Sequence, residues 1–181
     1  MSRRAASSLT LALAVLVGAV GTAQAFPSKR VATQARVAIS PLEADVLKEI
    51  NDFRVAHHLR PLRVSGRLAV AARHHSSEMA ARGYFSHTSA NGSSFDRRIA
   101  RFYPLHGARY WSVGENLLWS SPSVDAPGAL QMWLNSPPHR DILMTARWRE
   151  VGLSAIHVGS APGAYGGREV TIVTADFGVR R

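Results

Sequence analysis

WLNSPPHRDIL, residues 133–143, contains the strongest local signals of the chain. Pro137 and Pro138 cannot continue a helix, because proline lacks a backbone N–H and its ring clashes with the preceding turn. The pair predicts that a helix ends near Ser136 and that His139 follows on a stiff loop. An imidazole held in this way is a candidate metal ligand or proton carrier. A histidine that is only hydrogen-bonded into its loop would show the same pattern.

Capping residues and apolar spacing predict four helices in or before this stretch. They cover residues 41–57, 66–82, 94–99 and 126–136. The first has the clearest start, because Ser40 and Glu43 form a capping box around Pro41. The second carries His75 with Glu78 about one turn further on, and we interpret this as a structural pair rather than a metal site.

The C-terminal part of the chain favours strands instead of helices. Residues 150–158 and 168–177 are rich in β-branched residues, and the glycine-rich segment 159–167 joins them as a hairpin that pairs antiparallel. A further short strand is expected around Glu115, where Gly114 permits close approach of another part of the chain. Helices first and strands last indicate a layered α+β domain.

The first 25 residues resemble a secretory signal: two arginines, an apolar run and a cleavage site at Ala23-Gln24-Ala25. The arginine pair alone is weak support for twin-arginine export. We expect residues 1–25 to be a signal peptide, 26–39 a flexible lead-in and 40–181 the domain. The apolar run is too short for a membrane span. A mature chain without a transmembrane segment would be secreted, periplasmic or located at the cell envelope.

The composition restricts the classes of partner and the sources of stability. The formal net charge is +10; Arg3 and Arg4 of the expected signal contribute two of these charges, so the rest of the chain carries +8. This balance favours peripheral contact with anionic envelope surfaces. The basic residues are scattered and form no nucleic-acid motif, so no specific nucleic-acid partner is expected. Without cysteine the chain contains no disulfide and depends on its core.

Three titratable residues stand out as a candidate site: His87, Glu115 and His139. Two imidazoles and a carboxylate suit zinc or another divalent cation, and they equally suit acid–base chemistry. The residues are more than twenty positions apart, so their spacing leaves the choice open. Phe85 is expected to anchor the loop that carries His87.

At these positions the chain resembles a known family, the bacterial branch of the CAP superfamily (cysteine-rich secretory proteins, antigen 5 and pathogenesis-related 1 proteins; SCP-like domains). The resemblance covers about residues 42–178. The motifs that carry it are Phe85-Ser86-His87, Gly114-Glu115-Asn116, Trp133 with Ser136 and His139-Arg140, Val151-Gly152-Leu153 and Asp176-Phe177-Gly178.

The resemblance implies a three-layer α-β-α sandwich with a central antiparallel sheet. It also implies a large cleft lined by two histidines and two acids, and His87, Glu115 and His139 match three of these four. Ser136 stands where many eukaryotic members have the second acid, and a hydroxyl is a poorer zinc ligand than a carboxylate. Asn116 and Ser136 complete the expected ligand-binding cleft.

Two functions remain open on the sequence alone. The first is a secreted binding module for a lipid, a glycan or another cell-envelope ligand, with or without a divalent cation such as zinc. The alternative is a metal-assisted hydrolase that uses the same cleft. No serine stands beside an evident base, so no catalytic residue is assigned. A third possibility is a purely structural role, in which His87, Glu115 and His139 only stiffen the cleft wall through hydrogen bonds.

Overall fold

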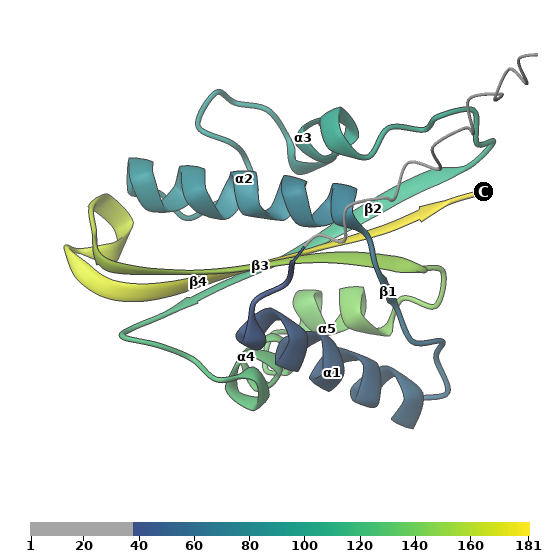
Figure 1. Ribbon diagram of the computed structural model, residues 1–181, viewed down its shortest axis with the longest axis horizontal. Coiled ribbons are helices and arrows are strands. Elements are labelled where there is room, and N and C mark those ends of the chain that lie inside the picture. The colour runs from purple at the N-terminus through teal and green to yellow at the C-terminus, as the bar shows by residue number, and fades with distance from the viewer. Residues whose placement is uncertain (1–37) are drawn as a thin grey trace, which may run out of the picture. The chain divides into compact units, whose positions relative to one another are not determined.

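A sheet enclosed between two layers of helices is the architecture of residues 38–181, the part of the chain that the computed structural model describes (Figure 1). The expected signal and nearly all of the lead-in lie outside the described residues. The elements are α1 Pro41–Ala56, β1 Arg63–Val64, α2 Gly66–Arg82, α3 Phe95–Phe102, β2 Trp111–Ser120, α4 Ala126–Leu134, α5 Pro137–Met144, β3 Glu150–Ala161, the 3-10 turn η1 Gly163–Tyr165 and β4 Arg168–Arg180.

The sheet has the strand order β1-β3-β4-β2. The three long strands are antiparallel, as predicted, and only the two-residue β1 runs parallel to its neighbour β3. Strand β4 comes last in the chain but lies inside the sheet, between β3 and β2. Strand β2 forms one edge. The hairpin predicted between β3 and β4 is confirmed, and both strands run three residues further than the sequence indicated.

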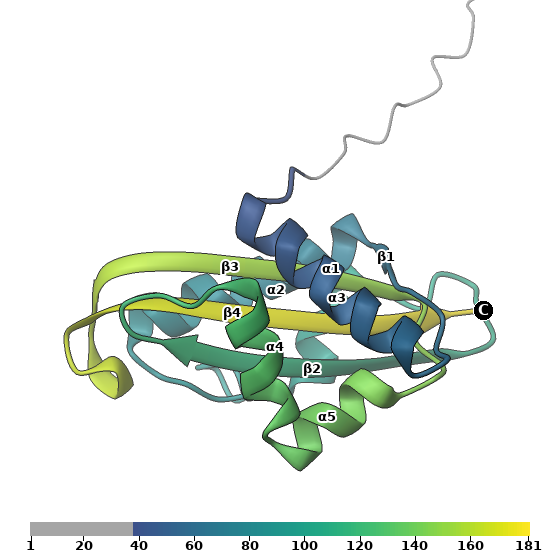
Figure 2. The same cartoon turned by 90° about the horizontal axis from the view of Figure 1, so that it is seen from below.

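Helices α2 and α3 cover one face of the sheet, and α1, α4 and α5 cover the other, so the predicted three-layer α-β-α sandwich is confirmed (Figures 1 and 2). Helix α2 lies very close to β3. A Cβ atom on Gly152 would lie 2.0 Å from backbone atoms of Leu68 and Ala69. Glycine at this position therefore sets the spacing between α2 and the sheet.

The predicted capping box of α1 is present and also attaches the helix to the sheet. The Ser40 backbone N–H donates to Glu43 Oε2 at 2.7 Å, and the Glu43 N–H donates to Ser40 Oγ at 3.2 Å. The other carboxylate oxygen of Glu43 accepts the backbone N–H of Ala155 in β3 at 2.9 Å. One buried carboxylate therefore satisfies both a helix end and a strand.

The prediction that His139 lies on a loop is wrong. Helix α4 does end before the prolines, at Leu134, but Pro137 and Pro138 are the first two residues of a new helix, α5. Proline is tolerated in the first helical turn because the N–H groups there have no intrahelical partner. His139 is therefore the third residue of α5.

Trp133 joins α4 to the edge strand. Its side chain is buried in the core between the sheet and α1, α4 and α5. The indole Nε1–H donates to the carbonyl oxygen of Leu117 in β2 at 3.1 Å. This contact fixes the end of α4, next to the junction with α5, against the same strand that carries Glu115.

We expect Trp133→Ala to lower the free energy of unfolding by about 3–5 kcal/mol, because it leaves a large cavity in the core. Trp133→Phe keeps most of the buried ring and loses the indole hydrogen bond, which should cost about 1–2 kcal/mol. Urea unfolding of both variants measures the difference. A loss for Trp133→Ala no larger than that for Trp133→Phe would contradict the assigned role in the core.

Candidate functional site

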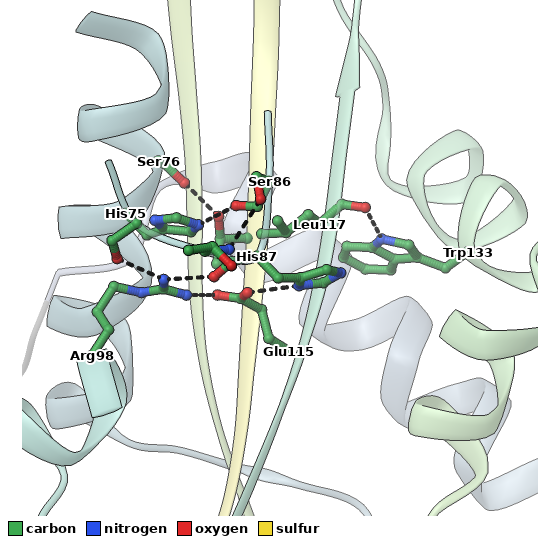
Figure 3. A network of polar contacts seen from close by, with 11 residues as sticks. His75, Ser76, Ser86, His87, Arg98, Glu115, Leu117 and Trp133 are labelled. Carbon is green, nitrogen blue, oxygen red and sulfur yellow. Dashed lines mark hydrogen bonds and ion pairs between the residues drawn. The ribbon is translucent and has the colours of Figure 1, made fainter. Parts of the chain in front are cut away.

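The predicted trio gathers along the edge strand β2. Glu115 lies in the middle of β2, His87 in the loop between α2 and α3, and His139 in α5 on the opposite helical layer. His87 Nδ1 lies 2.8 Å from Glu115 Oε1 (Figure 3). The ring centres of His87 and His139 are 6.3 Å apart. The structure therefore brings the two imidazoles together across the sheet edge, with the carboxylate behind one of them.

The buried Arg98 of α3 holds this arrangement together. Its Nη2 donates to Glu115 Oε2, and its Nη1 donates to the carbonyl oxygen of His87 and to Ser89 Oγ, both at 3.0 Å (Figure 3). Sequence reasoning missed Arg98. A carboxylate inside a strand does indicate a nearby cation, but nothing in the sequence distinguishes Arg98 from the exposed Arg97 and Arg101 of the same helix.

The structural interpretation of His75 and Glu78 is confirmed. His75 Nε2 contacts the carbonyl oxygen of Ser86 at 2.8 Å, and Glu78 accepts the hydroxyl hydrogen of Tyr84 at 2.6 Å. Both contacts tie α2 to the loop that presents His87. Burial lowers the pKa of His75 and favours the neutral ring, whose Nε2–H donates to this carbonyl oxygen.

The expectation that Phe85 anchors this loop is wrong, because its side chain is 38% exposed. Hydrogen bonds to the backbone hold the loop instead. Besides the contact of His75, the hydroxyl group of Tyr165 donates to the carbonyl oxygen of Tyr84 at 2.9 Å. A polar anchor of this kind leaves no apolar periodicity in the sequence, which is why the aromatic residue next to His87 was misleading.

Asn116 supports α5, while Ser136 lies at its N-terminus without a capping hydrogen bond from its side chain. The fully buried Asn116 donates its side-chain N–H to the carbonyl oxygen of His139 at 3.0 Å. Ser136 precedes the first residue of α5 and is half-buried. Burial, followed by the nearby His87, lowers the pKa of His139. His139 therefore has a lone pair available at neutral pH.

The charges around Glu115 favour its ionised form. Burial opposes ionisation, but the hydrogen bond with His87 and the positive charge of Arg98 outweigh it, so the pKa of Glu115 is lowered. Because ionised Glu115 accepts from Nδ1, a neutral His87 carries its proton on Nδ1 and exposes the lone pair of Nε2. The His87 side chain is 49% exposed, so this lone pair can meet a ligand from outside.

Asp176 is a second buried acid next to this network. It pairs with Glu115 across β2 and β4, so both side chains lie on the face covered by α2. Neither carboxyl oxygen of Asp176 has a hydrogen-bond partner among residues 38–181. Burial, together with the negative charge of Glu115, raises the pKa of Asp176 well above its usual range. The sequence showed the Asp176-Phe177-Gly178 motif but assigned this side chain no role.

The Asp176 carboxyl should make stability depend on pH. Its pKa is raised on folding, so the native state keeps the proton longer, and stability is lost as pH rises above the unfolded value of about 4. We expect the stability of Asp176→Asn relative to the native chain to increase with pH, by up to about 1.4 kcal/mol per pH unit in this range. Urea unfolding at several values between pH 4 and 7 measures this difference. A difference that stays constant would refute the buried neutral acid.

Of His87, Glu115 and His139, only the two histidines have a ring nitrogen available for a divalent cation. Within the described residues, no three histidine, aspartate or glutamate side chains are arranged to hold a metal ion. Both oxygens of Glu115 are already engaged by His87 and Arg98. Two imidazoles bound to one zinc ion have ring centres about 5–6 Å apart, because each Zn–N distance is about 2.0–2.1 Å. The ring centres of His87 and His139, at 6.3 Å, are close to this spacing. Glu115 is placed as the partner that orients a metal-binding histidine.

The α-β-α sandwich is the fold of a CAP (SCP-like) domain. Residues 47–177 match the Cysteine-rich secretory protein family (CAP), and the chain belongs to this family.

Curated relatives are longer than this chain. The uncharacterized membrane protein YlbC of Bacillus subtilis (strain 168) is 32% identical over 111 residues, which are 61% of this chain and 30% of that protein. The uncharacterized protein YkwD of the same organism is 28% identical over 129 residues, 71% of this chain and 48% of that protein. The chain therefore spans less than half the length of these relatives.

A solved structure supports the fold. An extracellular protein containing an SCP domain from Bacillus anthracis str. Ames is 25% identical, with a TM-score of 0.59 over 80% of this chain and 45% of that one. In this chain, no helix among residues 38–181 has the length and apolar character that crossing a membrane requires.

Proposed function

We propose that this chain is an extracellular binding domain that recognises a cell-envelope ligand, a lipid or a glycan, at the His87–His139 face of β2. One observation carries the proposal: imidazoles from opposite helical layers face each other, and the half-exposed one is fixed from behind by Glu115. The description of the Bacillus anthracis relative as an extracellular protein supports the location. The expected signal at residues 1–25 supports it as well.

Binding suits this geometry better than hydrolysis. The Glu115 side chain is buried and already accepts hydrogen bonds from His87 and Arg98, so it is poorly placed to take a proton from water. The two imidazoles offer fixed donors and acceptors, which match the hydroxyl groups of a glycan or a lipid headgroup. Rigid presentation lowers the entropic cost of binding such a ligand.

A divalent cation would be held by Nε2 of His87 and by the ring of His139, with Glu115 orienting His87. When bound, it would supply a positive charge that attracts anionic or hydroxyl oxygens of the ligand. Because the protein offers two imidazoles, the remaining positions would stay open to water or ligand. Such a site binds metal weakly compared with a closed four-ligand site.

Thermal unfolding with zinc tests the cation. A free zinc concentration one hundred times the Kd should stabilise the native chain by about 2.7 kcal/mol. His139→Ala should lose this gain, while His74→Ala, an exposed histidine on α2, should keep it. The gain should also vanish as pH falls below about 6, because protonated imidazoles do not bind metal. Equal zinc responses in the two variants would contradict the assignment.

Metal-assisted hydrolysis is the second candidate, and the lowered pKa of His139 favours it, because a ring that stays neutral at neutral pH can hold a cation that activates water. A hydrolase should turn over p-nitrophenyl esters or phosphodiesters with zinc present. Turnover should fall by about 100-fold or more in His139→Ala, because the cation that activates water would lose one of its two imidazole ligands. If the native chain shows no more zinc-dependent turnover than His139→Ala, the hydrolase hypothesis is rejected and the binding function is favoured.

A further inference from the structure

A hollow lies at the end of the sheet where β4 ends and β1 and β3 begin. It has a volume of about 450 Å³. Its polar lining consists of Arg63, Arg149, Arg180, Arg181, Glu150 and His106. None of its lining residues belongs to the His87–His139 site. The hollow is therefore a separate feature that the proposed function leaves unexplained.

The sheet register brings these arginines together from distant parts of the chain. Arg63 pairs with Glu150 in the parallel contact of β1 with β3, and Glu150 also pairs with Gly178 of β4. Arg149 directly precedes Glu150, and Arg180 and Arg181 follow Gly178 by two and three residues. Figure 1 shows this end of β4, marked C, near β1 and the start of β2.

Two of the guanidinium groups are held in place. Arg180 stacks on the ring of Tyr103 at 3.9 Å and donates from Nη1 to the carbonyl oxygen of Pro104 at 3.1 Å. Arg149 donates from Nη1 to three nearby carbonyl oxygens, at 2.7, 2.8 and 3.0 Å. Each group has further N–H donors beyond these contacts. Fixed arginines lose less conformational entropy when an anion binds.

The positive charge of the hollow is not balanced by the protein. None of the ion pairs among residues 38–181 includes Arg63, Arg149, Arg180 or Arg181. The single carboxylate in the lining, Glu150, accepts the hydroxyl hydrogen of Tyr103. Among the side chains that line the hollow, four arginines face one glutamate. Gathered like charges repel one another, and an anion bound between them would relieve that repulsion.

We propose that this hollow is a binding site for a phosphate group, presented by an envelope polymer or lipid headgroup or as free phosphate. Phosphate offers up to two negative charges and several acceptor oxygens in a compact group, which matches converging guanidinium forks. The volume accommodates the phosphate together with part of the molecule that carries it. The domain would then contact its surroundings at two places, the imidazole pair and the arginine hollow.

Calorimetric titration with inorganic phosphate tests the site, with acetate at equal ionic strength as the reference anion. Arg63→Gln combined with Arg181→Gln should raise the Kd for phosphate about tenfold, the size expected for one charge-assisted contact in partly screened surroundings. The matched control combines Arg97→Gln with Arg101→Gln, which removes the same charge from exposed positions on α3 outside the hollow. The control and His139→Ala should each bind phosphate as the native chain does.

Vesicles identify the source of the phosphate. Phosphatidylglycerol vesicles that bind the native chain and the α3 control, but not Arg63→Gln/Arg181→Gln, would assign a lipid headgroup. Saturable binding of inorganic phosphate with no difference between phosphatidylglycerol and phosphatidylcholine vesicles would assign a soluble or polymeric phosphate. Two results would overturn the phosphate site: an equal loss of phosphate affinity in the two double variants, or binding of phosphate no tighter than binding of acetate. Neither result depends on whether zinc binds at His139.

Discussion

The ion pair between Arg98 and Glu115 is the interaction on which the rest of the site depends. It is buried, so removal of either partner would leave a charge without compensation, which typically costs about 3–5 kcal/mol. The guanidinium group also holds the backbone of His87, so this single pair joins α3, the edge strand β2 and the loop between α2 and α3. The main effect of the network is to fix the positions of these residues. Its net contribution to the free energy of unfolding is small, because the cost of removing both charges from water offsets much of their attraction.

The alternation of side chains along β2 explains how one strand organises residues from both helical layers. Glu115 and Asn116 are neighbours in the strand, so they point to opposite faces. Glu115 contacts the ring of His87 on the α2–α3 side, and Asn116 holds the backbone of His139 on the α4–α5 side. An edge position is needed, because the two histidines can meet only where the sheet stops. A strand inside the sheet would keep the two layers apart.

Much of the fold followed from local signals in the sequence, while the support of the site did not. The capping box at Ser40 and the two long strands gave the correct elements. The histidine pair and Glu115 were found because polar residues in apolar surroundings mark a site. His139 was placed on a loop because Pro137 ends one helix and also begins the next, and only tertiary packing decides which. Arg98 and Asp176 matter through contacts with residues far away in the chain, which no local pattern records.

The interior position of β4 determines when the sheet can form. Strands β2 and β3 do not pair with each other; each pairs with β4, which is the last strand to leave the ribosome. Before β4 emerges, β2 has no partner strand, and the pairs that it later forms, from Trp111 with Arg180 to Ser120 with Thr171, join residues far apart in the sequence. Contacts of such long range make folding slow. A growing chain therefore cannot complete this sheet until β4 has been synthesised, however early β2 and β3 appear.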